Sequence, residues 1–246
     1  MKDTERRLTH FATLEDARGV LRSPIRLAVV TDLHNGPFED LLPLMEGVDA
    51  ILIVGDMVRR YSDGYDQALR FLQAAPDIAP TYYSLGNHEI RLASREAYMR
   101  GVAETRVTLL DNRVVRLRDD IALAGLTSTR QTKPDEARAL VDALAREEGF
   151  RLLMSHHPED YPRYIRGKGI DLTLSGHAHG GQIQIGGRGL YAPGQGLLPK
   201  WTDGFYDHNR LLVSRGLTNT NPVPRWGNPC ELILLTLVEK DALRAG

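Results

Sequence analysis

The feature that most constrains this 246-residue chain is a series of short apolar runs, each followed within three residues by Asp, Asn or His. Five runs show this pattern: 27–30, 51–54, 81–85, 152–154 and 172–174. Each has the length and composition of a β-strand. Ligands of open α/β sheets gather at the carboxyl ends of strands, so polar residues about 150 positions apart are expected to meet in one crevice.

The segments between these runs predict helices over 64–76, 91–104 and 134–148, and a further strand over 121–124. Alternation of strands and helices predicts βαβ units and an α/β fold. Near the N-terminus, apolar residues recur at roughly helical spacing from Leu8 through Phe11 and Leu14 to Leu21. We therefore expect a helical extension within residues 1–25.

The last third of the chain is dense in Gly and Pro between 180 and 229. This composition favours loops and short antiparallel strands over helices. Further strands are expected over 211–213 and 232–235. The sequence contains no linker, repeat or low-complexity segment, and we expect one domain over residues 1–246.

Charge and cysteine content exclude several classes of protein. The chain has 31 Lys and Arg against 32 Asp and Glu, a net charge of -1, so nothing indicates general attraction to nucleic acid. The single Cys230 allows no internal disulfide, which fits a reducing compartment. The N-terminal segment of the sequence is too charged for a secretory signal, and no apolar run is long enough to span a bilayer. We expect a cytoplasmic protein, or one bound peripherally at a membrane.

Six of the eight histidines lie directly after the apolar runs. They are His34, His88, His156, His157, His177 and His179, and they are joined by Asp32, Asp56 and Asn87. Imidazole and carboxylate are the ligands of Mn, Fe or Zn rather than of Mg or Ca alone. The inventory fits two metal ions, because Asp56 could bridge both. Such a pair clamps the attacking and leaving oxygens of a phosphate ester and acidifies a bound water.

Five motifs, in this order along the chain, resemble the signature of the calcineurin-like metallophosphoesterases. They are Asp32-x-His34, Gly55-Asp56, Gly86-Asn87-His88-Glu89, His156-x-Pro158 and Gly176-His177-x-His179. The resemblance covers about residues 26–238. It implies a four-layer αββα sandwich, with two mixed β-sheets flanked by helices. The activity implied is hydrolysis of a small phosphate-ester substrate by attack of a metal-bound hydroxide.

The resemblance also implies a role for each site residue. One metal would be held by Asp32, His34, Asp56 and His179, and the other by Asp56, Asn87, His156 and His177. His88 would sit over the leaving group as an acid or as an oxyanion partner. The motif selects His156 from the doubled histidine, but spacing by itself leaves His157 open.

The tail resembles a bacterial branch of this family that contains cell-envelope phosphodiesterases and UDP-diacylglucosamine diphosphatases. Its matching segments are 177–183, 190–196, 214–217 and 229–231. We therefore expect diesters or pyrophosphates to be preferred over monoesters. The candidate substrate-binding residues are Arg59, Arg60, Arg91, Lys200 and Trp201, with Arg188, Arg215, Asn219 and Trp226 also in reach of the same region. For the arginines, a position on a solvent-exposed loop without contact to substrate is an equally good explanation. For the tryptophans, packing within the fold is a simpler explanation than stacking on a substrate.

Three other functions are compatible with parts of this pattern. A phosphomonoesterase or protein phosphatase would use the same metal ligands. A nuclease would need a basic groove, which this near-neutral chain does not indicate. A non-catalytic scaffold should have lost ligands or His88, and here none is missing.

Overall fold

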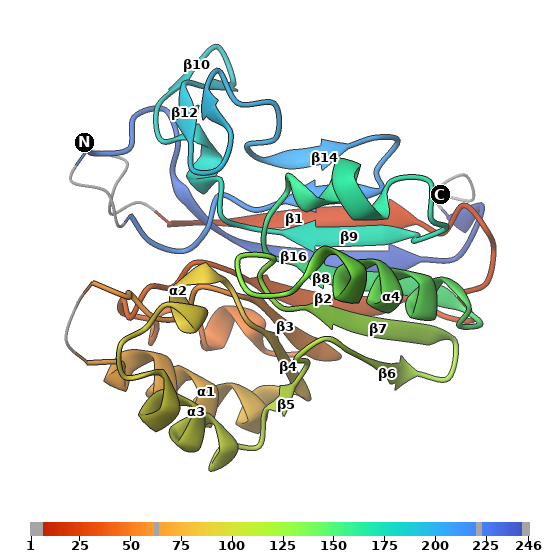
Figure 1. The fold of residues 1–246 in the computed structure, drawn as a ribbon. Helices are drawn as coiled ribbons and strands as arrows, with labels where there is room; N and C mark the ends of the chain where they lie inside the picture. The colour runs from red at the N-terminus through yellow and green to blue at the C-terminus, as the bar shows by residue number, and fades with distance from the viewer. Residues whose placement is uncertain (1–6, 62–63, 220–222, 243–246) are drawn as a thin grey trace.

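The computed structural model describes residues 7–61, 64–219 and 223–242. The charged N-terminal residues 1–6 and residues 220–222 of the Gly/Pro-rich region lie outside the described residues. Two six-stranded mixed sheets dominate this part of the chain (Figure 1). The first sheet has the order β1 (Arg7–Glu15), β16 (Cys230–Val238), β2 (Ile25–Val30), β3 (Ala50–Val54), β4 (Thr81–Ser84), β5 (Thr108–Leu109). The second has the order β14 (Gly204–Tyr206), β15 (Leu211–Val213), β9 (Leu172–Ser175), β8 (Phe150–Ser155), β7 (Ile121–Leu126), β6 (Arg113–Arg118).

The strands that precede the polar motifs are parallel within each sheet. In the first sheet β2, β3, β4 and β5 are parallel, and in the second β7, β8, β9 and β15 are parallel. The antiparallel pairs are β16 with β2, β6 with β7 and β14 with β15. The carboxyl ends of β2, β3 and β4 therefore share one edge, and those of β8 and β9 share another.

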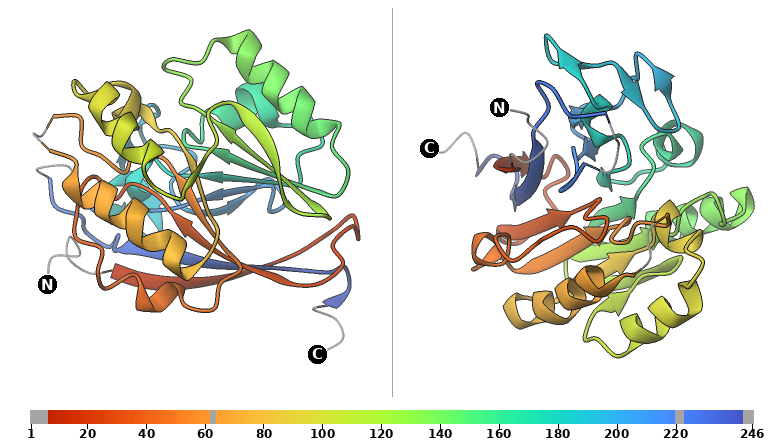
Figure 2. Two further views of the ribbon diagram at one scale, coloured as in Figure 1. Left: turned by 90° about the horizontal axis from the view of Figure 1, so that it is seen from below. Right: turned by 90° about the vertical axis from the view of Figure 1, so that its left-hand side faces the viewer.

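Helices cover the outer face of each sheet, which completes four layers in the order αββα (Figure 2). Helices α1 (Asp66–Ile78) and α3 (Arg95–Ala103) pack on the first sheet, and α4 (Pro134–Ala145) with η2 (Tyr161–Ile165) on the second. The remaining helices are short: η1 (Pro43–Met45), α2 (Asn87–Ile90) and η3 (His179–Gly181). The expected α/β sandwich is confirmed.

Alternation along each strand sends side chains to two different cores. In β2, Leu27 and Val29 face the second sheet, whereas Ala28 and Val30 face the helices. This is the period of two that a strand imposes. Because both faces of β2 are buried, its run is apolar throughout, as is usual for a parallel strand covered on both sides.

The prediction of a helix near the N-terminus is wrong, because residues 7–15 form strand β1. This strand pairs in parallel with β16 over nine residues, from Arg7 with Cys230 to Glu15 with Val238. Ala12 and Leu14 alternate into the core between the sheets, and Phe11 points outward with 73% of its surface exposed. Pairing with the edge of β16 outweighs a weak helical spacing, since strand propensity depends on tertiary context.

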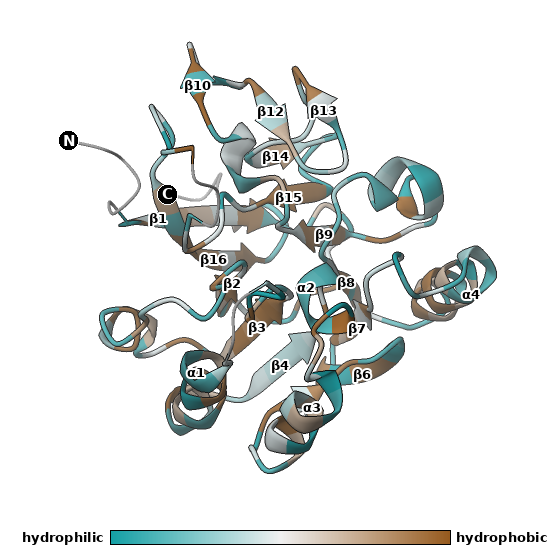
Figure 3. Cartoon of the chain, turned by 60° about the vertical axis from the view of Figure 1, so that its left-hand side comes forward, coloured by the Kyte–Doolittle hydropathy of each residue, from teal (hydrophilic) through white to brown (hydrophobic). Residues whose placement is uncertain are grey.

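The Gly/Pro-rich region forms short antiparallel strands, as expected. The pairs are β10 (Gln184–Ile185) with β11 (Arg188–Gly189) and β12 (Tyr191–Ala192) with β13 (Gly196–Leu197). Both hairpins project from the layers of the sandwich (Figure 3). The second hairpin lies beside the polar residues that follow β4 and β9, because Tyr191, Pro193 and Gly194 line one cavity with Asn87 and His177.

Candidate functional site

The polar residues that follow β2, β3, β4, β8 and β9 come together where the two sheets meet. They are Asp32, His34, Asp56, Asn87, His88, His156, His177 and His179. All are buried except His88, which is half-buried. Both sheets contribute, so the site depends on how the sandwich is assembled and not on any single motif.

Several of these residues sit in a backbone conformation that L-amino acids rarely adopt. Their φ angles are positive: Asp32 54°, His34 50°, Asp56 56°, His177 64° and His179 48°. The chain turns sharply at the end of each strand, and the turn keeps the side chain in the crevice. Left-handed non-glycine residues cost free energy and concentrate at functional sites.

Two motif glycines make room for the two carboxylates. A Cβ on Gly86 would lie 2.2 Å from Oδ1 of Asp56, and a Cβ on Gly176 would lie 2.4 Å from Oδ2 of Asp32. Both distances are too short for any side chain. The glycines in Gly86-Asn87-His88 and Gly176-His177-x-His179 are thus explained by close approach of the neighbouring loop.

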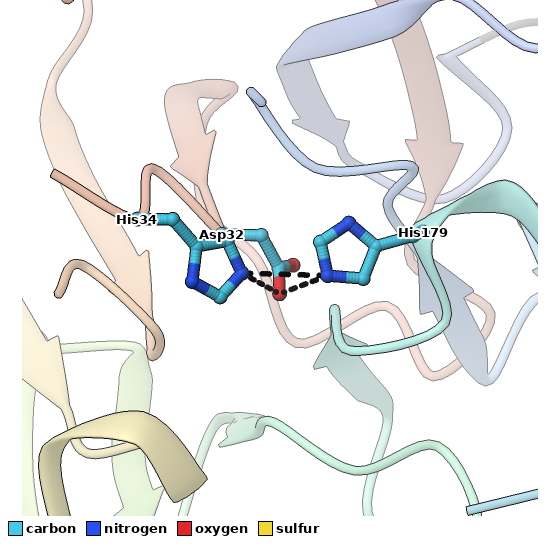
Figure 4. Close-up of side chains that lie close together, drawn as sticks. All are labelled: Asp32, His34 and His179. Carbon is cyan, nitrogen blue, oxygen red and sulfur yellow. Dashed lines mark hydrogen bonds and ion pairs between the residues drawn. The ribbon is translucent and has the colours of Figure 1, made fainter. Parts of the chain in front are cut away.

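One group of candidate ligands is formed by Asp32, His34 and His179 (Figure 4). Oδ1 of Asp32 lies 3.5 Å from Nε2 of each histidine, and the two Nε2 atoms are 3.3 Å apart. Nδ1 of His34 lies 3.2 Å from the carbonyl oxygen of Val58. A hydrogen bond to that carbonyl leaves the Nε2 lone pair facing the group, as in metal-binding histidines.

A second group is centred on Asp56. Its Oδ2 lies 3.0 Å from Nε2 of His156, and these two residues form a possible metal-holding set with His177. His34 and His88 approach the same carboxylate, at 4.0 Å and 3.9 Å from Oδ2. Asp56 therefore lies between the two groups and approaches residues of both.

Buried polar atoms without hydrogen bonds support metal binding here. Oδ1 of Asp32, Oδ1 of Asn87 and Nε2 of His177 are buried and make none. A buried polar atom without a partner is costly, and such atoms need an explanation. These three belong to residues with the right chemistry for a divalent cation, so the residues present fit the metals that the sequence implies.

The protonation states match this interpretation. Burial lowers the pKa values of His177 and His179 to about 3, so both rings are neutral. Burial would raise the pKa of Asp56, but His156 holds it well below its usual range. Against the effect of burial, Asp56 and Asp32 raise the pKa of His156 to about 10.

The doubled histidine separates into two environments. His156 faces Asp56, and its Nδ1 lies 2.8 Å from the carbonyl oxygen of Val54. Nε2 of His157 lies 2.6 Å from Oγ of Ser128, and its Nδ1 lies 3.9 Å from the buried Glu159. This geometry favours His156 as the ligand near Asp56, although His157, Glu159 and His177 also lie close enough to form a group.

Sequence reasoning missed the structural role of Glu89. Its buried carboxylate accepts hydrogen bonds from four backbone N–H groups, those of Asp56 (2.9 Å), Met57 (2.7 Å), Val58 (3.1 Å) and Gly86 (2.8 Å). Glu89 therefore fixes the loop that carries Asp56 against the loop that carries Asn87. Its place beside His88 in the motif was the available signal.

A cavity of about 250 Å³ adjoins the two groups. One wall is formed by Asp56, Asn87, His88, His177 and His179. Three arginines, Arg60, Arg91 and Arg130, also line it, and the hairpin region contributes Gln182, Tyr191, Pro193 and Gly194. Asp56 is the only acidic residue among the described residues that line it. Arg130 was missed, because nothing in the sequence marks the loop after β7 as part of the site.

The other predicted substrate contacts lie elsewhere. Arg59 lines a separate cavity of about 570 Å³ that reaches His34 from another direction, together with Arg7, Asn35 and Asn219. Lys200 and Trp201 line neither cavity. Trp201 packs partly buried against the core under α4, and Lys200 is exposed with its Nζ 5.2 Å from the Trp201 ring centroid. Arg215 is paired with Asp203 at 2.7 Å.

His88 lines the arginine-rich cavity with a defined tautomer. The backbone N–H of Arg60 donates to its Nδ1 at 3.2 Å, so the proton of the neutral ring is on Nε2. Burial lowers the pKa of His88 to about 4, which keeps the ring neutral. The site therefore holds a neutral N–H donor beside Asp56.

Groups able to hold divalent cations, beside a cavity lined by three arginines, are typical of a metal-dependent phosphoesterase. Residues 25–181 match the family model described as calcineurin-like phosphoesterase, and the chain belongs to this family.

Curated relatives agree with this assignment. The chain is 30% identical over 236 residues to an uncharacterized metallophosphoesterase of Campylobacter jejuni, Cj0846, and the match covers 89% of the chain and 61% of that protein. It is 26% identical over 184 residues to the phosphodiesterase YaeI of Escherichia coli, covering 66% of the chain and 63% of that protein. The chain thus spans about three fifths of the length of these two relatives. Among solved structures, TT1561 of Thermus thermophilus gives a TM-score of 0.44 at 17% identity, over 62% of the chain and 81% of that structure.

Within residues 7–61, 64–219 and 223–242, no helix combines the length and apolar character that crossing a membrane requires.

Proposed function

We propose that this chain is a two-metal phosphoesterase that hydrolyses phosphodiesters or pyrophosphates in preference to phosphomonoesters. The observation that carries the proposal is one cavity lined both by three arginines and by four of the candidate ligands, Asp56, Asn87, His177 and His179. One ion is assigned to Asp32, His34, Asp56 and His179, and the other to Asp56, Asn87, His156 and His177. Mn, Fe and Zn all suit this donor set.

Bound divalent cations supply charge for the phosphoryl oxygens and lower the pKa of water. The protein holds them in place through the carboxylates, which Gly86 and Gly176 admit, and through Glu89, which anchors the Asp56 loop. His88 is assigned to the leaving group. Because its ring is neutral with the proton on Nε2, it donates a hydrogen bond to the departing oxygen rather than acting as an imidazolium acid.

Charge in the cavity favours more than one anionic group in the substrate. Two divalent ions bring +4, and Asp32 with Asp56 return -2. Arg60, Arg91 and Arg130 add further positive charge on the other walls. A phosphomonoester could be held at the metals without these arginines. A substrate with a second phosphate, or with an extended phosphodiester, gives them a partner, and arginine binds phosphate oxygens with paired hydrogen bonds.

The test compares kcat/KM for p-nitrophenyl phosphate, bis(p-nitrophenyl) phosphate and a dinucleoside pyrophosphate, with Mn, Fe and Zn loaded separately. We expect the pyrophosphate or the diester to be cleaved best. Arg130→Ala should lower kcat/KM for the pyrophosphate by about 10–100-fold, the usual range for a charged hydrogen bond, and that for the simple diester much less.

Arg138→Ala serves as the control, because Arg138 is an exposed arginine of α4 that pairs with Asp135 and does not line the cavity. It should leave all three values unchanged. A protein that cleaves the monoester best, with Arg130→Ala affecting every substrate equally, would refute the preference while leaving the metal assignment intact.

A further inference from the structure

The two hairpins beside the site, with the adjoining segment around Trp226, expose an unusual set of large apolar side chains. The members of this set, here called the hairpin surface, are Ile185 (66% exposed), Tyr191 (46%), Leu197 (82%), Leu198 (77%), Val223 (45%) and Trp226 (74%). Only Phe11, Leu44 and Tyr61 are comparable among the other described residues. Two thirds of the exposed large hydrophobic residues therefore belong to one small part of the fold, and a concentrated apolar patch marks an interaction site.

Backbone hydrogen bonds link the segments that carry these side chains. The N–H of Gln184 donates to the carbonyl oxygen of Trp226 at 2.8 Å, which places Trp226 beside the strand that carries Ile185. The N–H of Leu190 donates to Ile183 at 2.9 Å, and that of Leu198 donates to Leu190 at 2.9 Å. The two hairpins are thus linked through Leu190. Figure 3 shows hydrophobic residues on both of them, away from the layers of the sandwich.

The charged residues of the segment that forms the hairpins have one sign. Residues 180–202 contain Arg188 and Lys200 and no Asp or Glu. The next carboxylate along the chain, Asp203, is already engaged by Arg215 at 2.7 Å and by Nε2 of Gln184 at 2.6 Å. Glu159 lies beneath Gly194 and is buried. The surface therefore offers apolar side chains and positive charge without exposed negative charge from this segment.

We propose that the hairpin surface docks the protein on an anionic lipid bilayer. Exposed Leu and Ile at the hairpins, with a Trp and with Arg and Lys at the margin, is the composition of segments that lie in a membrane interface. Tyr191, Pro193 and Gly194 also line the arginine-rich cavity, so docking through these hairpins places the cavity close to the lipid headgroups.

The test is cosedimentation of the full chain with sucrose-loaded vesicles, which requires no hydrolysis and stands apart from the proposed activity. We expect binding to phosphatidylcholine vesicles containing about 30% phosphatidylglycerol and much weaker binding to phosphatidylcholine alone. The double change Leu197→Asp with Leu198→Asp should lower the partition coefficient at least about tenfold, because charged residues are costly in the interface. Arg188→Gln and Lys200→Gln should each lower it about fivefold at low salt.

Leu44→Asp is the matched control, since Leu44 is an exposed leucine of η1, outside the hairpins. It should bind vesicles like the unchanged protein, and thermal unfolding should show that the double variant remains folded. No sedimentation with anionic vesicles, or equal sedimentation of the double variant, would overturn the proposal. So would concentration-dependent self-association in ultracentrifugation that the double variant abolishes, because the surface would then belong to a second copy.

Discussion

At the scale of single residues, the site depends on which atom of each side chain faces inward. His156 and His157 are adjacent in sequence, yet one lies 3.0 Å from Asp56 and the other lies against Ser128. Successive residues of an extended segment face opposite ways, so only one of the pair can turn toward Asp56.

This difference gives a direct prediction. His156→Ala should lose about one metal per chain, whereas His157→Ala should retain both, because only His156 faces the carboxylate that the two ions would share. Metal content after reconstitution, measured by elemental analysis, distinguishes the two variants. Loss of metal in His157→Ala only would move the ligand to His157 and its group with Glu159 and His177.

A second prediction concerns His88. If its Nε2–H stabilises the leaving oxygen, His88→Ala should lower kcat by roughly 10²–10³ with the metal content unchanged. The loss should be smaller for nitrophenyl esters, whose leaving oxygen carries less charge in need of stabilisation. Equal losses for activated and unactivated leaving groups would point to substrate binding, and loss of a metal would make His88 a ligand.

At the scale of elements, the N-terminal strand shows how pairing overrides a local pattern. Residues 8–21 have apolar spacing that suits a helix, but β16 offers an open edge along nine residues. In the resulting strand Leu14 packs between the sheets and Phe11 faces outward. The local spacing of apolar residues does not predict backbone hydrogen bonds to a distant segment of the chain.

Stability measurements test this arrangement. Leu14→Ala should lower the free energy of unfolding by about 2–3 kcal/mol, because it removes a buried side chain from the core between the sheets. Phe11→Ala should change it by less than about 0.5 kcal/mol, as expected for an exposed position. Denaturant titration of both variants gives the comparison. A helix packed through Phe11 would reverse the order.

At the scale of the whole molecule, the proposed metals would join the two halves of the sandwich. Asp32, Asp56 and Asn87 come from the first sheet, and His156, His177 and His179 come from the second. Ions held between them bind only the folded state. They would therefore stabilise the assembly of the sheets as well as the site.

Metal removal should consequently lower thermal stability. For an ion at a free concentration about 100 times its Kd, loss of binding removes about 2.7 kcal/mol. For a protein of this size, two such losses correspond to a fall in Tm of roughly 10 °C or more. Calorimetry with and without a chelator measures the fall, and Asp56→Asn should show little response to the chelator. A Tm that does not change when metal leaves would exclude this coupling.

The sequence by itself determined the α/β class, the main strands and helices, and the polar residues that gather at the strand ends. These features follow from local rules. The spacing of apolar residues predicts strands, and polar residues that follow parallel strands lie at the same edge of the sheet.

Only the tertiary structure decided the rest. It made β1 a strand, turned His156 rather than His157 toward Asp56, and brought Arg130 to the cavity. It also left Lys200 and Trp201 outside that cavity, although they lie in the same Gly/Pro-rich region as Tyr191 and Pro193, which line it. The hydrophobic residues of loops and edge strands show little periodicity. Contacts with distant parts of the chain therefore determine the path of these segments and the direction of their side chains.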